Sequence, residues 1–201
     1  MKKPPFSDPT VGYYDRNATL FCGATGGVNM SHLYAEFLPL VPKGGKILDA
    51  GCGSGRDALF FKQNGYSVTA FDASPELASL ATQALGEPVK VMTFLGFDSA
   101  AEFDGIWACA SLLHVPALEI DAVFHRLTNA LKIGAPLYVS FKYGSTEGRR
   151  GERFFNDYNE VKLQALLRRH PRLSVLKIWH THDARPTREH ELWLNSVLKR
   201  S

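Results

Sequence analysis

Residues 46–56 read KILDAGCGSGR, and this stretch decides the fold. A short apolar run ends at Asp49 and passes directly into three alternating glycines. Residues 57–65 behind them have the pattern of a helix that closes at Asn64 and Gly65. We interpret this strand, glycine turn and helix as a nucleotide-binding corner, because glycine lets the backbone approach a ligand and a helix N-terminus presents unpaired N–H groups.

Two phosphate-binding motifs fit this corner poorly. A Walker loop requires lysine and then serine or threonine after its last glycine, but Arg56 and Asp57 follow Gly55. The dinucleotide fingerprint requires a glycine at its sixth position, where Arg56 stands instead. Asp49 would also bring negative charge towards a pyrophosphate, as would Asp57. The sequence therefore disfavours a pyrophosphate ligand and favours one that carries positive charge.

A second acidic residue matches a ribose. Asp72 ends a β-rich run over residues 66–72, and seventeen residues separate it from Gly55. This spacing is typical of the acidic residue that binds ribose hydroxyls in Rossmann-like sheets. A carboxylate that caps the next helix or its turn is the alternative interpretation of Asp72, and the spacing leaves it open.

The order of the remaining segments predicts an α/β fold. Strands alternate with helices from residue 46 to residue 170, which implies a parallel sheet with right-handed crossovers. Two late strands, 173–180 and 189–198, are joined by too few residues for a crossover helix, so we expect them to pair antiparallel. We further expect a loose tail over 1–8, a third strand over 89–94, and a polar loop over 144–151.

Composition sets limits on function. The formal charge of +3 and the pI near 8.7 indicate an ordinary solvated surface rather than a nucleic-acid-binding face. The cysteines Cys22, Cys52 and Cys109 are odd in number and lack a Cys-x-x-Cys pair, so we predict neither disulfides nor a metal site. Without an apolar leader or an apolar run of membrane-spanning length, we expect a cytoplasmic protein with no membrane contact.

These features together resemble class I S-adenosylmethionine-dependent methyltransferases. The resemblance rests on Asp49–Gly55, on Asp72, and on Leu112–Val115 after the predicted fourth strand. It covers the chain from about residue 30 to the C-terminus and is nearest to small bacterial members of the tellurite-resistance-like type. The resemblance implies a Rossmann-like three-layer sandwich whose seven-stranded, mostly parallel sheet has the order 3-2-1-4-5-7-6, with strand 7 antiparallel. It also implies S-adenosylmethionine as cofactor and S-adenosylhomocysteine as product.

The resemblance further implies roles for individual residues. Asp49 would lie beneath the amino group of the cofactor, and Asp72 would bind its ribose hydroxyls. Residues 93–98 lack the Gly-Asp-Ala order that is commoner in the family. The remaining implied contacts are backbone contacts to the methionine part and ribose from Gly51, Cys52 and Gly53, adenine contacts from Ala73, Phe97 and Asp98, and further methionine contacts from Cys109 and Ala110.

Methyl transfer from a sulfonium is an in-line displacement that needs alignment of the acceptor and exclusion of water. A base is needed only if the acceptor loses a proton, and His114 is our candidate. A structural histidine that binds a loop backbone is the alternative. We expect one domain over residues 1–201 with a helical lid over 8–40. The predicted lid and acceptor-pocket residues are Tyr13, Tyr14, Arg16, Tyr143, Arg149 and Arg153.

The arginines beyond the fifth strand suit a carboxylate or phosphate on the acceptor, although a solvated loop would carry them too. Residues 110–113 lack the Asn/Asp-Pro-Pro-aromatic motif of nucleic-acid amino-methylating enzymes, and no Pro-Cys nucleophile occurs. We therefore predict a methyltransferase that acts as a monomer or homodimer on a small molecule. A non-catalytic cofactor-binding regulatory module and a nucleic-acid or protein methyltransferase are the alternatives.

Overall fold

The computed structural model describes residues 8–185 and 188–201, and the tail expected over residues 1–8 lies outside them except for Asp8. Seven strands form one sheet. They are β1 (Lys46–Ala50), β2 (Ser67–Asp72), β3 (Lys90–Val91), β4 (Gly105–Ala108), β5 (Pro136–Lys142), β8 (Leu173–His182) and β9 (Leu192–Arg200). Two more strands, β6 (Glu147–Arg150) and β7 (Arg153–Asn156), pair with each other as a separate hairpin.

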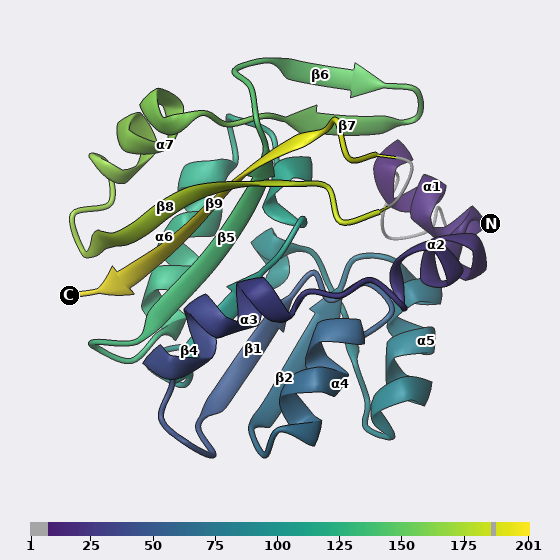
Figure 1. Ribbon diagram of the computed structural model, residues 1–201, viewed down its shortest axis with the longest axis horizontal. Coiled ribbons are helices and arrows are strands. Elements are labelled where there is room, and N and C mark those ends of the chain that lie inside the picture. Colours follow the sequence, from purple (N-terminus) through teal and green to yellow (C-terminus); the bar gives the residue numbers. More distant parts are fainter. Residues whose placement is uncertain (1–7, 186–187) are drawn as a thin grey trace.

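The order of the sheet is β3-β2-β1-β4-β5-β9-β8 (Figure 1). When the separate hairpin is left out of the numbering, this is the predicted order 3-2-1-4-5-7-6. The first five strands run parallel, and β9 pairs antiparallel with both β5 and β8. The predicted terminal hairpin and the Rossmann-like fold class are thus confirmed.

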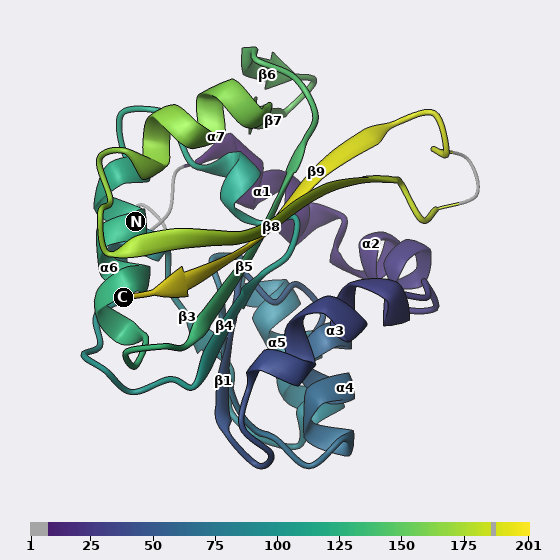
Figure 2. The same ribbon diagram turned by 60° about the vertical axis from the view of Figure 1, so that its left-hand side comes forward.

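Helices cover both faces of the sheet. They are α1 (Pro9–Arg16), α2 (Ala18–Thr25), α3 (Ser31–Phe37), α4 (Arg56–Gln63), α5 (Pro75–Leu85), α6 (Ile120–Ala130) and α7 (Glu160–Leu167). Short 3-10 helices occur at η1 (Leu38–Leu40), η2 (Phe94–Gly96) and η3 (Leu112–His114). Figure 2 shows α3, α4 and α5 on one face, and α6 and α7 on the other. Among the described residues, no helix is long and apolar enough to cross a membrane.

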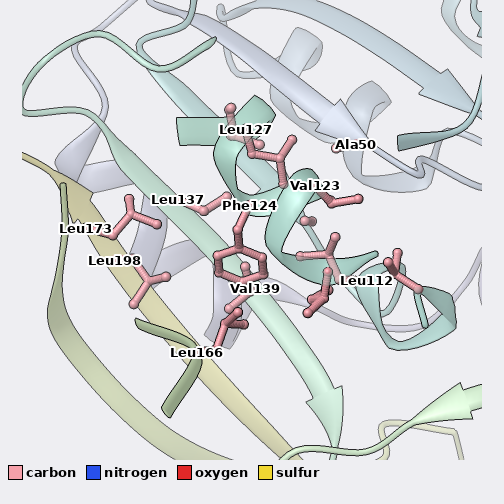
Figure 3. Packing of buried hydrophobic residues seen from close by; sticks show 14 of the residues in the cluster. Ala50, Leu112, Val123, Phe124, Leu127, Leu137, Val139, Leu166, Leu173 and Leu198 are labelled. Carbon is pink, nitrogen blue, oxygen red and sulfur yellow. The ribbon is translucent and has the colours of Figure 1, made fainter. Parts of the chain in front are cut away.

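Alternation along the strands supplies a core to each face. In β5, Leu137 and Val139 point towards α6, where Phe124 and Leu127 pack against them (Figure 3). Tyr138 lies between them in sequence and points to the opposite face. All five of these side chains are almost completely buried. The sheet is therefore apolar on both sides, as is typical of parallel sheets covered by helices.

The second face carries a polar centre among aromatic rings. Asp57, in the first turn of α4, is only 6% exposed. Its Oδ1 accepts hydrogen bonds from Tyr34 Oη at 2.6 Å and from Arg56 Nε at 2.6 Å. Its Oδ2 accepts from Trp107 Nε1 at 2.8 Å and from Arg56 Nη2 at 3.0 Å. The carboxylate thus joins α3, α4 and β4, and its burial is compensated by both charge and hydrogen bonds.

Two short helices, α1 and α2, begin the described chain. Asp8 caps α1 by accepting from Thr10 N at 2.8 Å, and Pro9 is the first helical residue. α1 ends at Arg16, and after Asn17 the chain continues as α2 to Thr25. α1 contacts α5 and β7, so the segment lies across the end of the sheet where the parallel strands finish (Figure 1).

Two expected segments differ from the structure. The third strand spans only two residues, because Thr93 Oγ1 accepts from Gly96 N at 3.2 Å and turns the chain into η2. The expected polar loop over 144–151 instead supplies β6, which pairs with β7 through Gly148 opposite Phe155 and Arg149 opposite Phe154. The charged residues of this segment gave no strand pattern in the sequence, and β6 forms by pairing with β7.

The Asp57 centre is testable by unfolding. Replacing Asp57 with alanine leaves the part-buried guanidinium of Arg56 without its partner, and we expect a loss of about 3–5 kcal/mol in the free energy of unfolding. Urea denaturation followed by circular dichroism measures this loss. Glu152→Ala is the matched control, because it breaks the Arg16–Glu152 pair whose side chains are each 59% exposed. That control should cost about 0–1 kcal/mol, and equal effects of the two variants would contradict the assignment.

Candidate functional site

The glycine turn between β1 and α4 forms the floor of the site. Gly51, Gly53 and Gly55 have φ values of 76°, 57° and 84°, in the left-handed region that favours glycine. A Cβ on Gly51 would lie 2.5 Å from the Cβ of Ser111, so no side chain fits there. The alternating glycines therefore follow from backbone conformation, and Gly51 also from the close approach of the segment after β4.

Two cavities adjoin at this turn. The first extends over the ends of β1, β4 and β5 towards the β8–β9 connection, and the second extends over the end of β2 towards η2 and α6. Both are lined by side chains of the N-terminal helices above and by the glycine turn below. The residues common to both cavities are Tyr14, Phe21, Gly51, Gly53, Ala110 and His114.

Asp49 supplies a buried carboxylate to the first cavity. It is 2% exposed, and its Oδ2 has no hydrogen-bond partner among the described residues. Burial raises the pKa of Asp49 well above its usual range, and the negative charge of Asp57 adds to the shift. A buried acceptor without a partner is costly, so a ligand group that donates a hydrogen bond or carries positive charge would be stabilised here.

Asp72 supplies a carboxylate to the second cavity. Its Oδ2 accepts from Gly53 N at 2.8 Å, and its Oδ1 accepts from Ser74 N at 2.9 Å. Burial raises the pKa of Asp72, while these hydrogen bonds to Ser74 and Gly53 oppose the shift. Each carboxylate oxygen keeps a further lone pair for a ligand hydroxyl. The residue thus ties β2 to the glycine turn and still faces the cavity.

Tyr14 and His114 meet where the two cavities join. Tyr14 Oη lies 2.9 Å from His114 Nε2, and His114 Nδ1 lies 2.6 Å from the carbonyl oxygen of Phe154. Because a carbonyl only accepts, Nδ1 carries the proton and Nε2 accepts from the tyrosine hydroxyl. Burial lowers the pKa of His114 to about 4, which keeps the ring neutral at neutral pH. Burial raises the pKa of Tyr14, so its hydroxyl keeps its proton.

Most of the predicted cofactor residues line these cavities. The first cavity contains Asp49, Cys52 and Cys109, the second contains Asp72 and Ala73, and both contain Gly51, Gly53 and Ala110. Burial raises the pKa of Cys109 to about 12, so its thiol stays protonated.

Phe97 and Asp98 line neither cavity, which corrects the expected adenine border. Phe97 is buried in the core, stacked on Phe71 with ring centroids 5.3 Å apart, and Asp98 is exposed. The early end of β3 is the physical cause, because η2 turns the chain before it reaches residue 97. The residues that line this part of the second cavity are Met92, Thr93, Phe94 and Leu95.

The predicted lid and acceptor residues divide into two groups. Tyr14 and Arg153 line the first cavity. Tyr13 lies behind Arg153, whose guanidinium carbon is 4.8 Å from its ring centroid. The others lie outside both cavities. Arg16 pairs with Glu152 at 2.6 Å, Tyr143 donates to Glu160 Oε2 at 3.3 Å, and Arg149 is exposed on β6.

Several lining residues escaped sequence reasoning. Lys142 ends β5, Phe155 lies on β7, and Trp193 lies on β9, and all three line the first cavity. Arg185 and Arg188 belong to the β8–β9 connection, whose ends lie near α2 in Figures 1 and 2. No local motif marks these positions, because the terminal hairpin reaches the site only through the tertiary fold.

Comparisons with known proteins agree with this geometry. A family model described as a methyltransferase domain matches residues 25–153. The ubiquinone biosynthesis O-methyltransferase of Xanthomonas axonopodis pv. citri is 32% identical over 108 residues, and this match covers 50% of the chain and 44% of that protein. The match therefore spans less than half the length of that relative.

Solved structures share the fold. The 1,6-didemethyltoxoflavin-N1-methyltransferase of Burkholderia thailandensis, with bound 1,6-didemethyltoxoflavin and S-adenosylhomocysteine, has a TM-score of 0.75 and 21% identity. That likeness covers 100% of this chain and 93% of the other. The cyclase SpnF has a TM-score of 0.74 and 17% identity, covering 98% of each chain. Because the family model spans more than half of the sequence, the chain belongs to the methyltransferase-domain family, and its fold is that of the S-adenosylmethionine-dependent enzymes named above.

Proposed function

We propose that this protein transfers a methyl group from S-adenosylmethionine to a small molecule. The observation that carries the proposal is the placement of two buried carboxylates on either side of the glycine turn. Asp49, whose Oδ2 has no hydrogen-bond partner in the described part of the chain, lines the first cavity, and Asp72 lines the adjoining one. One ligand with a cationic amino group and a ribose would satisfy both.

The residues of the cleft fit this cofactor by their chemistry. Asp49 would bind the amino group, and Asp72 would accept hydrogen bonds from the two ribose hydroxyls. Ala73, Phe94 and Leu95 line the second cavity and would form an apolar wall for adenine. The backbone of Gly51, Cys52 and Gly53 would contact the methionine part and ribose, and Cys109 and Ala110 would line the methionine part. When bound, the cofactor supplies a methyl group on a sulfonium whose sulfur leaves as a neutral thioether.

The acceptor would bind in the first cavity beyond the methionine part. Leu113, Phe155 and Trp193 line this end together with His114 and Arg153. We propose that residues 8–40 act as a lid within a single domain, since Tyr14 and Phe21 on α1 and α2 line both cavities. Such a cover excludes water from the reacting atoms and holds a small acceptor in line with the methyl group.

His114 has a positioning role in this proposal rather than that of a general base. Its Nε2 already accepts a hydrogen bond from the Tyr14 hydroxyl, and burial lowers the pKa of His114 to about 4. A base with so low a pKa accepts a proton poorly at neutral pH. The hydrogen bond between the two residues instead holds the Tyr14 oxygen at the junction of the cavities. The proton of the tyrosine hydroxyl then points towards the imidazole.

The site also fits a protein of the reducing cytoplasm. Cys22, Cys52 and Cys109 are free thiols. We also propose that the protein acts as a monomer or homodimer.

The fold alone does not specify methyl transfer, because SpnF shares it and is a cyclase. Calorimetry with S-adenosylmethionine, followed by a turnover assay for S-adenosylhomocysteine over a panel of phenols, amines and carboxylic acids, tests the proposal. Binding without turnover across that panel would favour a regulatory module, and turnover only on nucleic acid or protein would favour a macromolecular acceptor.

The ribose contact is testable with two aspartates. Asp72→Ala should weaken S-adenosylhomocysteine binding by roughly 10- to 100-fold, because charged acceptors for the ribose hydroxyls are lost. Isothermal titration calorimetry measures the change. Asp98→Ala, which removes an exposed carboxylate outside both cavities, should leave the affinity unchanged. The reverse pattern, with Asp98 important and Asp72 dispensable, would restore the sequence-based adenine border and contradict the structure.

The state of His114 is testable by NMR. Long-range proton–nitrogen spectra should show a protonated Nδ1 and a bare Nε2, with no titration between about pH 5.5 and 8. A midpoint near 6.5, or a proton on Nε2, would contradict the hydrogen-bond assignment.

The same pKa shift predicts a pH dependence of stability. Between pH 6.5 and about 4 the unfolded chain gains a proton at His114 that the folded chain does not, so stability falls as pH falls through this window. Over this pH window, the wild-type protein should lose on the order of 3 kcal/mol at most in free energy of unfolding beyond any loss that His114→Gln shows.

A further inference from the structure

We infer that the acceptor is a small aromatic acid whose carboxylate binds Arg153. The inference rests on the proposed function and adds the chemical class of the acceptor. Arg153 begins β7 and lines the first cavity, the same cavity that contains His114 and Tyr14. Three observations support the inference: the ion pairs of the cavity, the surroundings of the Arg153 guanidinium, and the apolar lining beside that guanidinium.

The charge balance singles out Arg153 among the arginines and lysines of the cavity. Arg56 pairs with Asp57 at 2.6 Å, and Arg185 pairs with Asp183 at 2.5 Å. The two remaining cations, Lys142 and Arg188, both pair with Glu191. Within residues 8–185 and 188–201, Arg153 makes no ion pair. Arg153 is therefore the one arginine or lysine of this cavity that has no carboxylate partner among the described residues.

The acidic residues near Arg153 in sequence are already engaged. Glu152 pairs with Arg16 at 2.6 Å, and Asp157 pairs with Arg150. Both partners lie outside the first cavity, so these pairs direct the two carboxylates away from it. The charge of Arg153 is thus left for a ligand rather than neutralised within its own hairpin.

Aromatic rings surround the guanidinium. Its carbon lies 4.8 Å from the ring centroid of Tyr13, 5.1 Å from that of Phe155 and 5.9 Å from that of Tyr14. Rings at this range attract a cation through the face of the π-system and restrict its movement. Among the described residues its one hydrogen bond runs from Nη1 to Tyr14 Oη, at 3.5 Å. Most of the five N–H donors of the guanidinium therefore remain available for a planar, bidentate anion such as a carboxylate.

The lining beside Arg153 favours a flat body. Phe155, Trp193 and Leu113 line the same cavity, and aromatic side chains bind planar ligands by stacking and edge contacts. An acid bound to Arg153 would place its ring against these side chains, near the Tyr14 hydroxyl. The carboxylate of the cofactor itself is the other source of the same anion, and the experiment must separate the two.

Calorimetry on the complex with S-adenosylhomocysteine separates them. The probes are 4-hydroxybenzoate and 4-aminobenzoate, each compared with its uncharged methyl ester. The wild-type complex should bind at least one acid more tightly than its ester. Arg153→Met should weaken binding of that acid by roughly 10- to 100-fold, with little change for the ester and for S-adenosylhomocysteine.

Two further variants keep the test decisive. Arg153→Lys retains the charge without the planar fork and should bind the acid with intermediate affinity, which excludes misfolding as the cause of a loss. Arg168→Met removes an exposed arginine at the C-cap of α7, outside both cavities, and should change nothing. Equal affinity of the wild-type complex for acids and esters overturns the inference. So does a loss of S-adenosylhomocysteine affinity in Arg153→Met without a loss of acid binding, which would assign Arg153 to the cofactor. In both cases the proposed function stands, because the wild-type protein still binds S-adenosylhomocysteine, whereas failure of that binding would contradict the proposed function.

Discussion

The buried carboxylate of Asp57 is the interaction on which the site depends. It accepts hydrogen bonds from Tyr34 on α3, from Arg56 at the start of α4 and from Trp107 on β4. These contacts fix the first turn of α4 against the sheet, and the glycine turn leads directly into that helix. The floor of both cavities is therefore held by a charge that the protein can bury only because every contact is made. Burial raises the pKa of Asp49, and the nearby charge of Asp57 adds to that rise.

The electrostatics of the first cavity follow a simple pattern. Most of its charged side chains are paired with one another or with a residue just outside it, as in Arg56 with Asp57 and Arg185 with Asp183. Among the described residues two groups depart from this pattern. They are the Oδ2 of Asp49 and the guanidinium of Arg153, one acidic and one basic. An unpaired buried or half-buried polar group lowers stability unless a ligand satisfies it. We therefore assign the first group to the cofactor and the second to the acceptor.

Local signals in the sequence predicted much of this architecture. The alternating glycines require left-handed backbone, Asp72 follows at the spacing of a ribose-binding acid, and the short final connection allows only an antiparallel pair. Other features depended on tertiary contacts. The early end of β3 displaced Phe97 and Asp98 from the cleft, and the presence of Thr93 in the sequence was not enough to predict the turn into η2. Arg153 was proposed from the sequence as an acceptor residue and lines the first cavity. Trp193 and Arg185 reach that cavity only because the terminal hairpin extends beyond the sheet.

A crystal structure of the complex with S-adenosylhomocysteine tests the central claim most directly. The account predicts that the amino nitrogen of the ligand lies about 3 Å from Asp49 Oδ2, and that both ribose hydroxyls lie at a similar distance from the Asp72 carboxylate. The adenine ring should then lie against Ala73, Phe94 and Leu95. A ligand whose amino group lies away from Asp49, or whose ribose does not contact Asp72, would contradict the account.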